Sequence, residues 1–362
     1  MNKTNKILLL CPSLPGGVAA FYNTLELEKF WNIDYFIINN PKEQSGFGTF
    51  RRLVRNYFIF FYKVIRDQYD LIHLNPSLGK RSFYRDSIFI IIARILNKNT
   101  LVLFNGWQEP FEREIKKSRF KRNLFKISYA RVNYYVVLSQ LFKKKLQELG
   151  VPLSTPFFTI TTVADSRFIK DFNLGKKVEN FQEKVTFLVL SRITKEKGIY
   201  IALDAFKAFS MLNTKQKSCL NIAGDGEELA AAKDYVTEQN ISNVVFLNHV
   251  SDDKKNKILE ESHIMLLTSY SEGLPNSILE GMLYGMPIIS RITGGIPDII
   301  KQGENGFLTE SLDPFIFAGF MNTISSDNNL YKKMAFNNHR IALENYTTEK
   351  IRQRFSKIYT EC

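Results

Sequence analysis

Short apolar runs separated by amphipathic stretches recur from one end of the chain to the other. In the first half, the runs have the length of strands and are apolar on both faces, while 17–30, 82–97 and 140–149 have the apolar spacing of helices. Strands that are apolar on both faces form parallel sheets covered by helices on each side. The first half therefore predicts a doubly wound α/β domain. Its strand-like runs are 6–12, 34–40, 70–76, 100–106, 134–139 and 157–163.

The second half repeats this alternation, so it predicts a second doubly wound domain. Its strand-like runs are 185–191, 218–224, 244–250, 264–269 and 286–291, and its helical stretches are 198–212, 227–239, 252–262 and 275–285. The polar stretch 170–184 is the predicted linker. We therefore expect an N-terminal domain over 1–175 and a C-terminal domain over 176–330. The amphipathic tail 331–362 is expected to be helical and could pack back on the N-terminal domain.

The composition excludes several classes of protein. No apolar run approaches the roughly 20 residues that a helix needs to span a bilayer. The N-terminal "KILLLC" is shorter than the apolar part of a secretory signal, so it is interpreted as a first buried strand. Three scattered cysteines predict neither a disulfide framework nor a zinc site, and this fits a reducing cytoplasm. The four histidines have no metal-ligand spacing, so no metal site is expected.

The positive charge of the chain is confined to one half. The net charge is +13, and residues 1–175 carry 27 Lys+Arg against 13 Asp+Glu, whereas residues 176–362 carry 22 against 23. Such a one-sided field indicates an anionic partner for the first half, which could be a membrane surface, a nucleic acid or an acidic substrate.

Three motifs in the second half follow predicted strands. The first is "SRITKEKG" (191–198), in which Arg192 and Lys197 lie in a turn that opens a helix. An arginine binds phosphate oxygens through two parallel hydrogen bonds and a lysine adds a movable charge, so the pair could hold a diphosphate. The alternative is a solvated basic turn. The second motif, "NIAGDGEE" (221–228), permits a close backbone approach to a ligand, but it lacks the full three-glycine dinucleotide fingerprint, and taken alone it favours an ordinary strand-to-helix turn.

The third motif is "SEGLPNSILEGM" (271–282), which begins as a loop and becomes a helix. Pro275 suits the first helical turn, where the backbone N–H groups of Asn276 and Ser277 lack partners and attract phosphate. Glu272 lies before the helix and Glu280 within it, so each carboxylate could accept hydrogen bonds from sugar hydroxyls. The alternative is a surface helix with acids near its N-terminus, which explains neither the glycine loop nor the second turn at 293–297.

Together these motifs resemble the retaining glycosyltransferases of family 4, which are group 1 glycosyltransferases with the GT-B fold. The resemblance is carried by "EGLPNSILEGM", "GMPII", "GGIPDII", "SRITKEKGIYIALDAF" and "IAGDGEE", and at the front by "ILLLCPSLPGGVAAF". It covers nearly the whole chain and is most specific in 185–310. It implies two Rossmann-like domains facing across a cleft, and retaining transfer of a sugar, of the hexosyltransferase type, from a nucleoside-diphosphate-sugar.

The resemblance also implies a role for each motif residue. Glu272, Arg192 and Lys197 would be catalytic, with Glu272 on the transferred sugar and the two cations on the diphosphate. Glu280 would bind the ribose hydroxyls. The remaining substrate-binding residues would be Gly16 and Gly17 in the N-terminal loop, and Gly273, Leu274, Pro275, Asn276 and Ser277 at the helix start. The family needs neither metal nor cofactor, because cations and a helix end stabilise the leaving diphosphate.

The chain departs from the family after the fourth predicted strand. Many relatives carry a histidine before the glycine there, whereas this chain has Asn105, which forms hydrogen bonds but does not titrate. His73, at the end of the third predicted strand, is a substitute candidate for contact with substrate. A core histidine is an equally good interpretation of that position.

The basic segments 51–67 and 113–126 interleave Lys and Arg with aromatic and aliphatic residues at helical spacing. Such helices can lie on an anionic membrane, although they could also be ordinary core helices. We therefore expect a peripheral protein on the cytoplasmic face of the membrane, with a lipid-linked saccharide acceptor, in lipopolysaccharide or capsule synthesis. The alternatives are a sugar-nucleotide epimerase or hydrolase on the same fold, an inactive scaffold, or a non-enzymatic nucleic-acid or membrane binder. No nucleic-acid-binding motif is present, so nucleic acid is not an expected partner.

Overall fold

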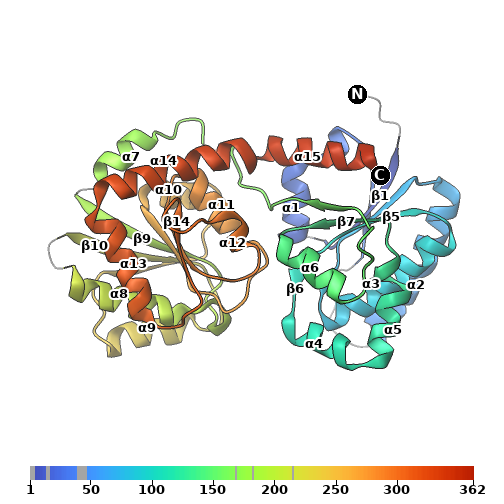
Figure 1. Ribbon diagram of the computed structural model, residues 1–362, viewed down its shortest axis with the longest axis horizontal. Coiled ribbons are helices and arrows are strands. Elements are labelled where there is room, and N and C mark those ends of the chain that lie inside the picture. Colours follow the sequence, from blue (N-terminus) through green and yellow to red (C-terminus); the bar gives the residue numbers. More distant parts are fainter. Residues whose placement is uncertain (1–4, 14–16, 39–46, 168, 182, 214–215) are drawn as a thin grey trace. The chain divides into compact units, whose positions relative to one another are not determined.

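The computed structural model describes residues 5–13, 17–38, 47–167, 169–181, 183–213 and 216–362. The chain forms two compact units (Figure 1). The first unit combines Met1–Thr161 with Glu349–Cys362, and the second unit is Thr162–Thr348.

The first unit is built on a parallel six-stranded sheet in the order β2-β1-β3-β5-β7-β8. Its strands are β1 (Lys6–Cys11), β2 (Asn32–Ile37), β3 (Leu71–Leu74), β5 (Asn99–Leu103), β7 (Tyr134–Val137) and β8 (Phe157–Thr159), with a separate pair β4 (Ser77–Leu78) and β6 (Gly106–Trp107). Its helices are α1 (Gly17–Leu25), α2 (Phe47–Asp67), α3 (Lys80–Ile95), α4 (Glu109–Lys117), α5 (Arg119–Ile127), α6 (Gln140–Glu148) and α15 (Thr348–Glu361). The central strands are almost wholly buried, as their unbroken apolar sequences predict.

The second unit has a parallel sheet in the order β11-β10-β9-β12-β13-β14. Its strands are β9 (Lys184–Leu190), β10 (Lys217–Ala223), β11 (Val244–Asn248), β12 (Ile264–Leu267), β13 (Ile288–Arg291) and β14 (Gly306–Thr309). Its helices are α7 (Leu174–Asn180), α8 (Ile199–Leu212), α9 (Leu229–Glu238), α10 (Asp252–Glu261), α11 (Asn276–Leu283), α12 (Ile296–Ile299), α13 (Pro314–Ser326) and α14 (Asn328–Asn345). The predicted α/β class with two doubly wound sheets is confirmed.

The stretch 170–184 differs from the prediction, because it contains the helix α7 rather than an unstructured linker. Leu174, Val178 and Phe181 have helical spacing and are buried in the core of the second unit. Lys177, on the same helix, is also buried, and its Nζ donates to the carbonyl oxygens of Leu259 and Tyr284, each at 2.8 Å. Burial lowers the pKa of Lys177 well below its usual value. These contacts attach α7 to the ends of α10 and α11, so the second unit begins before the predicted boundary at 175/176.

The predicted helical tail is two helices that belong to different units. The helix α14 packs in the second unit, whereas α15 packs on α1 in the first unit (Figure 1). The indole nitrogen of Trp31 donates to Ser356 Oγ at 3.1 Å, and Arg352 Nε donates to the carbonyl oxygen of Leu25 at 2.6 Å. The C-terminal helix is therefore part of the core of the first unit.

Candidate functional site

The strand order of the second unit fixes where a ligand can enter. In this sheet the first strand along the sequence is β9. The next two strands, β10 and β11, lie on one side of it, and the chain then crosses over to place β12 on the other side. In open parallel sheets, ligands bind beyond the carboxyl ends of the strands at such a switch point. The loops that follow β9 and β12 are 191–198 and 268–275, which contain the first sequence motif and the start of the third.

The turn after β9 is fastened to the loop after β12. Thr268 Oγ1 donates to the carbonyl oxygen of Gly198 at 2.8 Å, and the Tyr270 N–H donates to the carbonyl oxygen of Glu196 at 2.9 Å. Gly198 has φ +70°, and a Cβ there would lie 2.3 Å from the Thr268 carbonyl oxygen. Only glycine satisfies both this conformation and this close approach.

This attachment brings Lys197 to Glu272. The distance from Lys197 Nζ to Glu272 Oε1 is 2.7 Å, and the exposed fractions of the two side chains are 18% and 7%. A pair withdrawn from water to this degree interacts more strongly than a surface pair, but each charge depends on the other for stabilisation. The two residues are therefore joined at the switch point, although they lie far apart in the sequence.

The glycine turn after β10 supports the same loop from its other side. The Ile193 N–H donates to the carbonyl oxygen of Asp225 at 2.9 Å. Gly224 has φ +153°, and a Cβ there would lie 1.8 Å from the Ser191 carbonyl oxygen. The segment "GDG" is therefore the support of the turn that carries Arg192. The Arg192 side chain is exposed and has no hydrogen-bond or ion-pair partner in the described part of the chain.

The helix α11 begins at Asn276 with Pro275 as its N-cap residue, and no side chain caps its first turn. The N–H groups at this end, including that of Ser277, are therefore available to a ligand. The preceding loop is supported by the second glycine turn, because the Gly295 N–H donates to the carbonyl oxygen of Gly273 at 2.6 Å. The Leu274 side chain is buried, so it anchors the loop in this conformation.

Glu280 has a lysine partner of its own. Lys255, on α10, places its Nζ 2.6 Å from Glu280 Oε1, and the exposed fractions of the side chains are 25% and 13%. Burial raises the pKa of Glu280, while Lys255 acts in the opposite direction and the carboxylate of Asp165 reinforces the rise. The sequence motifs did not point to Lys255, because α10 has the composition of an ordinary charged surface helix.

The first unit holds the remaining predicted residues. Gly16 lies outside the described residues. Gly17 is exposed at the start of α1, and a Cβ there would contact nothing within 4 Å. Asn105 follows β5, and its Nδ2 donates to Asn75 Oδ1 at 3.3 Å. It therefore lies at the carboxyl edge of the sheet, which is the expected edge for a ligand.

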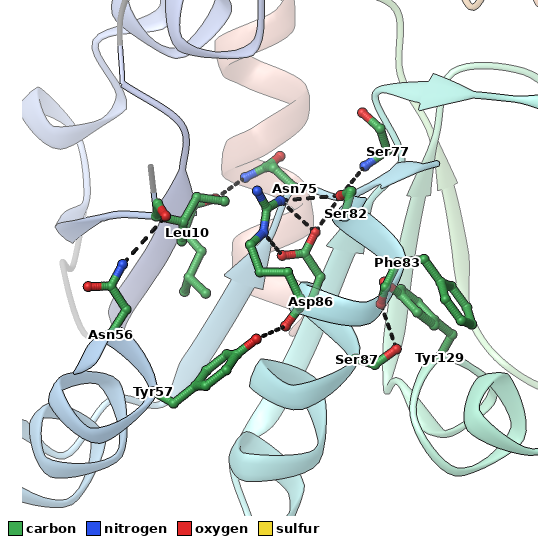
Figure 2. A network of polar contacts seen from close by, with 12 residues as sticks. Leu10, Asn56, Tyr57, Asn75, Ser77, Ser82, Phe83, Asp86, Ser87 and Tyr129 are labelled. Carbon is green, nitrogen blue, oxygen red and sulfur yellow. Dashed lines mark hydrogen bonds and ion pairs between the residues drawn. The ribbon is translucent and has the colours of Figure 1, made fainter. Parts of the chain in front are cut away.

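Asn75 forms several hydrogen bonds at this edge, and Figure 2 shows the one to Leu10. Its Nδ2 donates to the carbonyl oxygen of Leu10 at 3.0 Å, and its Oδ1 accepts from Tyr22 at 2.6 Å. Nearby, Ser82 Oγ accepts from the Ser77 N–H at 3.0 Å and donates to Asp86 at 2.6 Å (Figure 2). These bonds fix the ends of β1 and β3 and the start of α3 relative to one another.

His73 lies in the core of the first unit. It is completely buried, with Tyr22 OH 3.2 Å from Nε2 and Tyr359 OH 2.8 Å from Nδ1. Burial lowers its pKa to about 3. This position agrees with the core interpretation of His73, and leaves its side chain no surface for contact with a substrate.

Because His73 is buried, the stability of the first unit is expected to depend on pH. A neutral histidine with a lowered pKa stabilises the folded state above pH 6.5, and this contribution is lost as the pH falls towards 3, because only the unfolded chain takes up the proton. We expect His73 to contribute about 1.4 kcal/mol per pH unit to the fall in the free energy of unfolding of the first unit in this range, and His73→Gln to reduce the slope by this amount. Both tryptophans, Trp31 and Trp107, lie in the first unit, so tryptophan fluorescence during urea unfolding measures it. An unchanged slope in the variant would contradict the assignment.

The described residues contain neither a candidate metal site nor a membrane-spanning helix. Within that part of the chain, no group of three or more His, Cys, Asp or Glu side chains could hold a metal ion. None of the described helices is long and apolar enough to cross a membrane.

The second unit, including its loops, matches a known protein family. The model described as "Glycosyl transferases group 1" matches residues 171–340, which contain all the loops at the switch point. The second unit is thus similar over most of its length to the group 1 glycosyl transferases, and we call it the group 1 domain. Among characterised relatives, N-acetyl-alpha-D-glucosaminyl L-malate synthase of Bacillus anthracis is 27% identical over 241 residues, which are 66% of this chain and 62% of the relative. The chain thus matches about three fifths of the length of that relative.

A further relative of the group 1 domain is the amylovoran biosynthesis glycosyltransferase AmsK of Erwinia amylovora, which is 25% identical over 206 residues, or 54% of this chain and 48% of the relative. Among solved structures, HepE of Anabaena in complex with UDP has a TM-score of 0.73 at 18% identity, covering 99% of this chain and all of that one. The match extends the likeness beyond the group 1 domain to both units, and the fold is GT-B with two Rossmann-like domains.

Proposed function

We propose that the chain is a retaining glycosyltransferase of family 4 that moves a hexose from a nucleoside-diphosphate-sugar to a saccharide acceptor. The observation that carries the proposal is the Lys197–Glu272 pair at the switch point of a group 1 domain. A cation and a carboxylate held together there match the two needs of the reaction. The cation stabilises the departing diphosphate, and the carboxylate binds sugar hydroxyls.

In the proposed reaction, the bond between the anomeric carbon and the diphosphate oxygen breaks, and a bond from an acceptor hydroxyl oxygen to that carbon forms on the same face. The diphosphate leaves with the bonding electrons, and the acceptor proton leaves with it. The added negative charge on the diphosphate would be stabilised by Arg192, by Lys197 and by the first N–H groups of α11. Arg192 is available for this role because its side chain has no partner in the described residues. These groups would do the work that a metal ion does in other transferases, so the proposal includes neither metal nor cofactor.

Ligands that bind only the folded state raise its melting temperature, so a thermal-shift screen of nucleotide sugars tests the donor proposal. Structures of HepE with UDP and with UDP-glucose make the uridine donors the first to try. We expect one donor to stabilise the protein and to be consumed with release of the nucleoside diphosphate only when an acceptor is present. An α-configured product from an α-configured donor would establish retention. A sugar nucleotide with inverted configuration at one ring carbon, formed without an acceptor, would instead favour the epimerase.

The proposed acceptor is a lipid-linked saccharide at the cytoplasmic face of the membrane, in synthesis of a surface polysaccharide. The name of AmsK, an amylovoran biosynthesis glycosyltransferase, supports the proposed role in polysaccharide synthesis. The exposed surface of α2 supports the proposed binding to a membrane. Large side chains on this helix are exposed beside arginines: Phe58 is 70% exposed and Tyr62 63%, with Arg51 and Arg55 on the same helix. The first unit carries 29 Lys+Arg against 13 Asp+Glu, and the second unit 20 against 23. Aromatic and cationic groups together suit the interface of an anionic bilayer.

Pelleting with liposomes of anionic lipid tests the membrane proposal. We expect the protein to pellet at low salt and Phe58→Ser/Tyr62→Ser to remain in solution, because both exposed rings would otherwise enter the interface. The matched control is Phe315→Ser/Phe336→Ser, which removes rings that are 69% and 53% exposed in the second unit. Equal pelleting of the two double variants would overturn the assignment of this surface.

A further inference from the structure

Glu280 is held by a side chain that the proposed function does not use. Lys255 Nζ contacts only one of its carboxylate oxygens, Oε1, at 2.6 Å. The other oxygen, Oε2, has no hydrogen-bond partner in the described part of the chain. Lys255 therefore occupies one side of the carboxylate and leaves the other side available to a ligand.

The surroundings of Glu280 disfavour its charge in the absence of this lysine. The Glu280 side chain is only 13% exposed, and the nearby charged group of the same sign is Asp165. Asp165 is itself paired with Arg167, with Arg167 Nη2 2.6 Å from Asp165 Oδ2. Tyr284, the C-cap residue of α11, is also in electrostatic contact with Glu280. Lys255 is thus the cation that directly contacts the Glu280 carboxylate among these neighbours.

The position of the pair makes this charge relevant to ligand binding. Glu280 lies on α11, whose uncapped start belongs to the loop that carries Glu272. An ionised carboxylate accepts hydrogen bonds from two hydroxyls, and such bonds are about twice as strong as those of a neutral group. A protonated Glu280 would lose this advantage.

We propose that Lys255 is a positioning residue for the donor, which keeps Glu280 ionised and oriented so that its free oxygen accepts hydrogen bonds from ribose hydroxyls. This inference rests on the proposed nucleotide-binding function. Lys255 need not touch the nucleotide, because it acts through the carboxylate. Its loss therefore has an effect that depends on pH, whereas the loss of a purely structural contact between α10 and α11 does not.

The first measurement needs no nucleotide. Carbon-13 NMR of protein labelled at the glutamate carboxyl carbon follows the titration of Glu280, whose signal is identified by its absence in Glu280→Gln. We expect the midpoint to rise by at least one pH unit in Lys255→Met and to return in Lys255→Arg. Lys254→Met is the matched control, because Lys254 is the exposed neighbour on the same helix and has no ion-pair partner among the described residues. An unchanged midpoint in Lys255→Met overturns the inference whether or not a nucleotide binds.

The second measurement is the affinity for uridine diphosphate, with guanosine diphosphate in parallel, by calorimetry between pH 5.5 and 8.5. In Lys255→Met we expect binding about tenfold weaker at the acidic end and close to that of the unmodified protein at the alkaline end. In Glu280→Gln the affinity should be lower than that of the unmodified protein at every pH, without the recovery at the alkaline end that we expect for Lys255→Met. If Lys255→Met lost the same fraction of its affinity at every pH, the proposal would be overturned and Lys255 would be only a structural contact between α10 and α11. Failure of every nucleoside diphosphate to bind the unmodified protein would instead contradict the proposed function, while the NMR titration would still decide the role of Lys255.

Discussion

Lys197→Ala is expected to lower the turnover number for sugar transfer by about a hundredfold to a thousandfold. Removal of one preorganised group that stabilises developing charge typically has an effect of this size, and Lys197 is the cation held at the switch point. Turnover is measured as release of nucleoside diphosphate at saturating donor. Lys195→Ala is the matched control, because this neighbouring side chain is 77% exposed and lies 3.7 Å from Glu228. A similar loss in both variants would contradict the role of Lys197.

Lys197→Ala also leaves the Glu272 carboxylate buried without its partner, so misfolding must be distinguished from lost chemistry. Glu272→Gln makes this distinction, because it removes the charge of the acid and keeps its shape. We expect Glu272→Gln to lose transfer, but to bind nucleoside diphosphate at least as tightly as the unmodified protein, because Lys197 is then released from competition between the carboxylate and phosphate. Weaker binding in a folded Glu272→Gln protein would contradict this sharing of Lys197.

Gly294→Ala is expected to abolish detectable transfer, because it displaces the loop that carries Glu272. Gly294 has φ +54°, and a Cβ there would lie 2.2 Å from the carbonyl oxygen of Glu272 and 2.3 Å from that of Gly273. Backbone atoms cannot approach so closely, so the loop must move. The measurement is transfer activity together with hydrogen exchange of the segment 268–276, which we expect to become faster.

Gly303→Ala is the control that separates the two effects of Gly294→Ala, which are the steric clash of the new Cβ and the strain of the left-handed backbone conformation. Gly303 also has positive φ, +74°, but a Cβ there would meet nothing within 4 Å. A left-handed conformation costs about 1–2 kcal/mol for a residue with a side chain, so both variants share this loss of stability. Only Gly294→Ala should lose activity and gain exchange in the loop. Equal activity in the two variants would show that the glycine turn does not support Glu272.

The alternation of apolar runs predicted most of the fold, because a strand buried on both faces leaves an unmistakable unbroken apolar segment. The helix α7 was missed, since its three buried apolar residues are interrupted by Lys177 and other polar groups that suggest a linker. Lys177 is buried because it donates to backbone carbonyls at the ends of α10 and α11. Such a partner cannot be recognised before the tertiary structure brings those helix ends to the lysine.

The candidate site shows the same limit. The contact between Lys197 and Glu272 agrees with the motifs, because both lie in loops that follow neighbouring strands of a parallel sheet. Lys255 could not be distinguished from the other lysines of α10 by sequence. For His73, the decisive neighbour is Tyr359, which comes from the opposite end of the chain. Local pattern therefore locates loops well, and it locates the partners of single side chains poorly.

The return of α15 to the first unit means that the chain joins the two units by two covalent connections, near residues 161–162 and 348–349. A single proteolytic cut in either connection would leave the two units linked through the other connection, together with the packing of α15 on the first unit. A fragment that ended at residue 161 would expose the apolar surface that α15 covers. Production of the first unit on its own would therefore need the last fourteen residues, supplied as a separate peptide or spliced on by a short artificial loop.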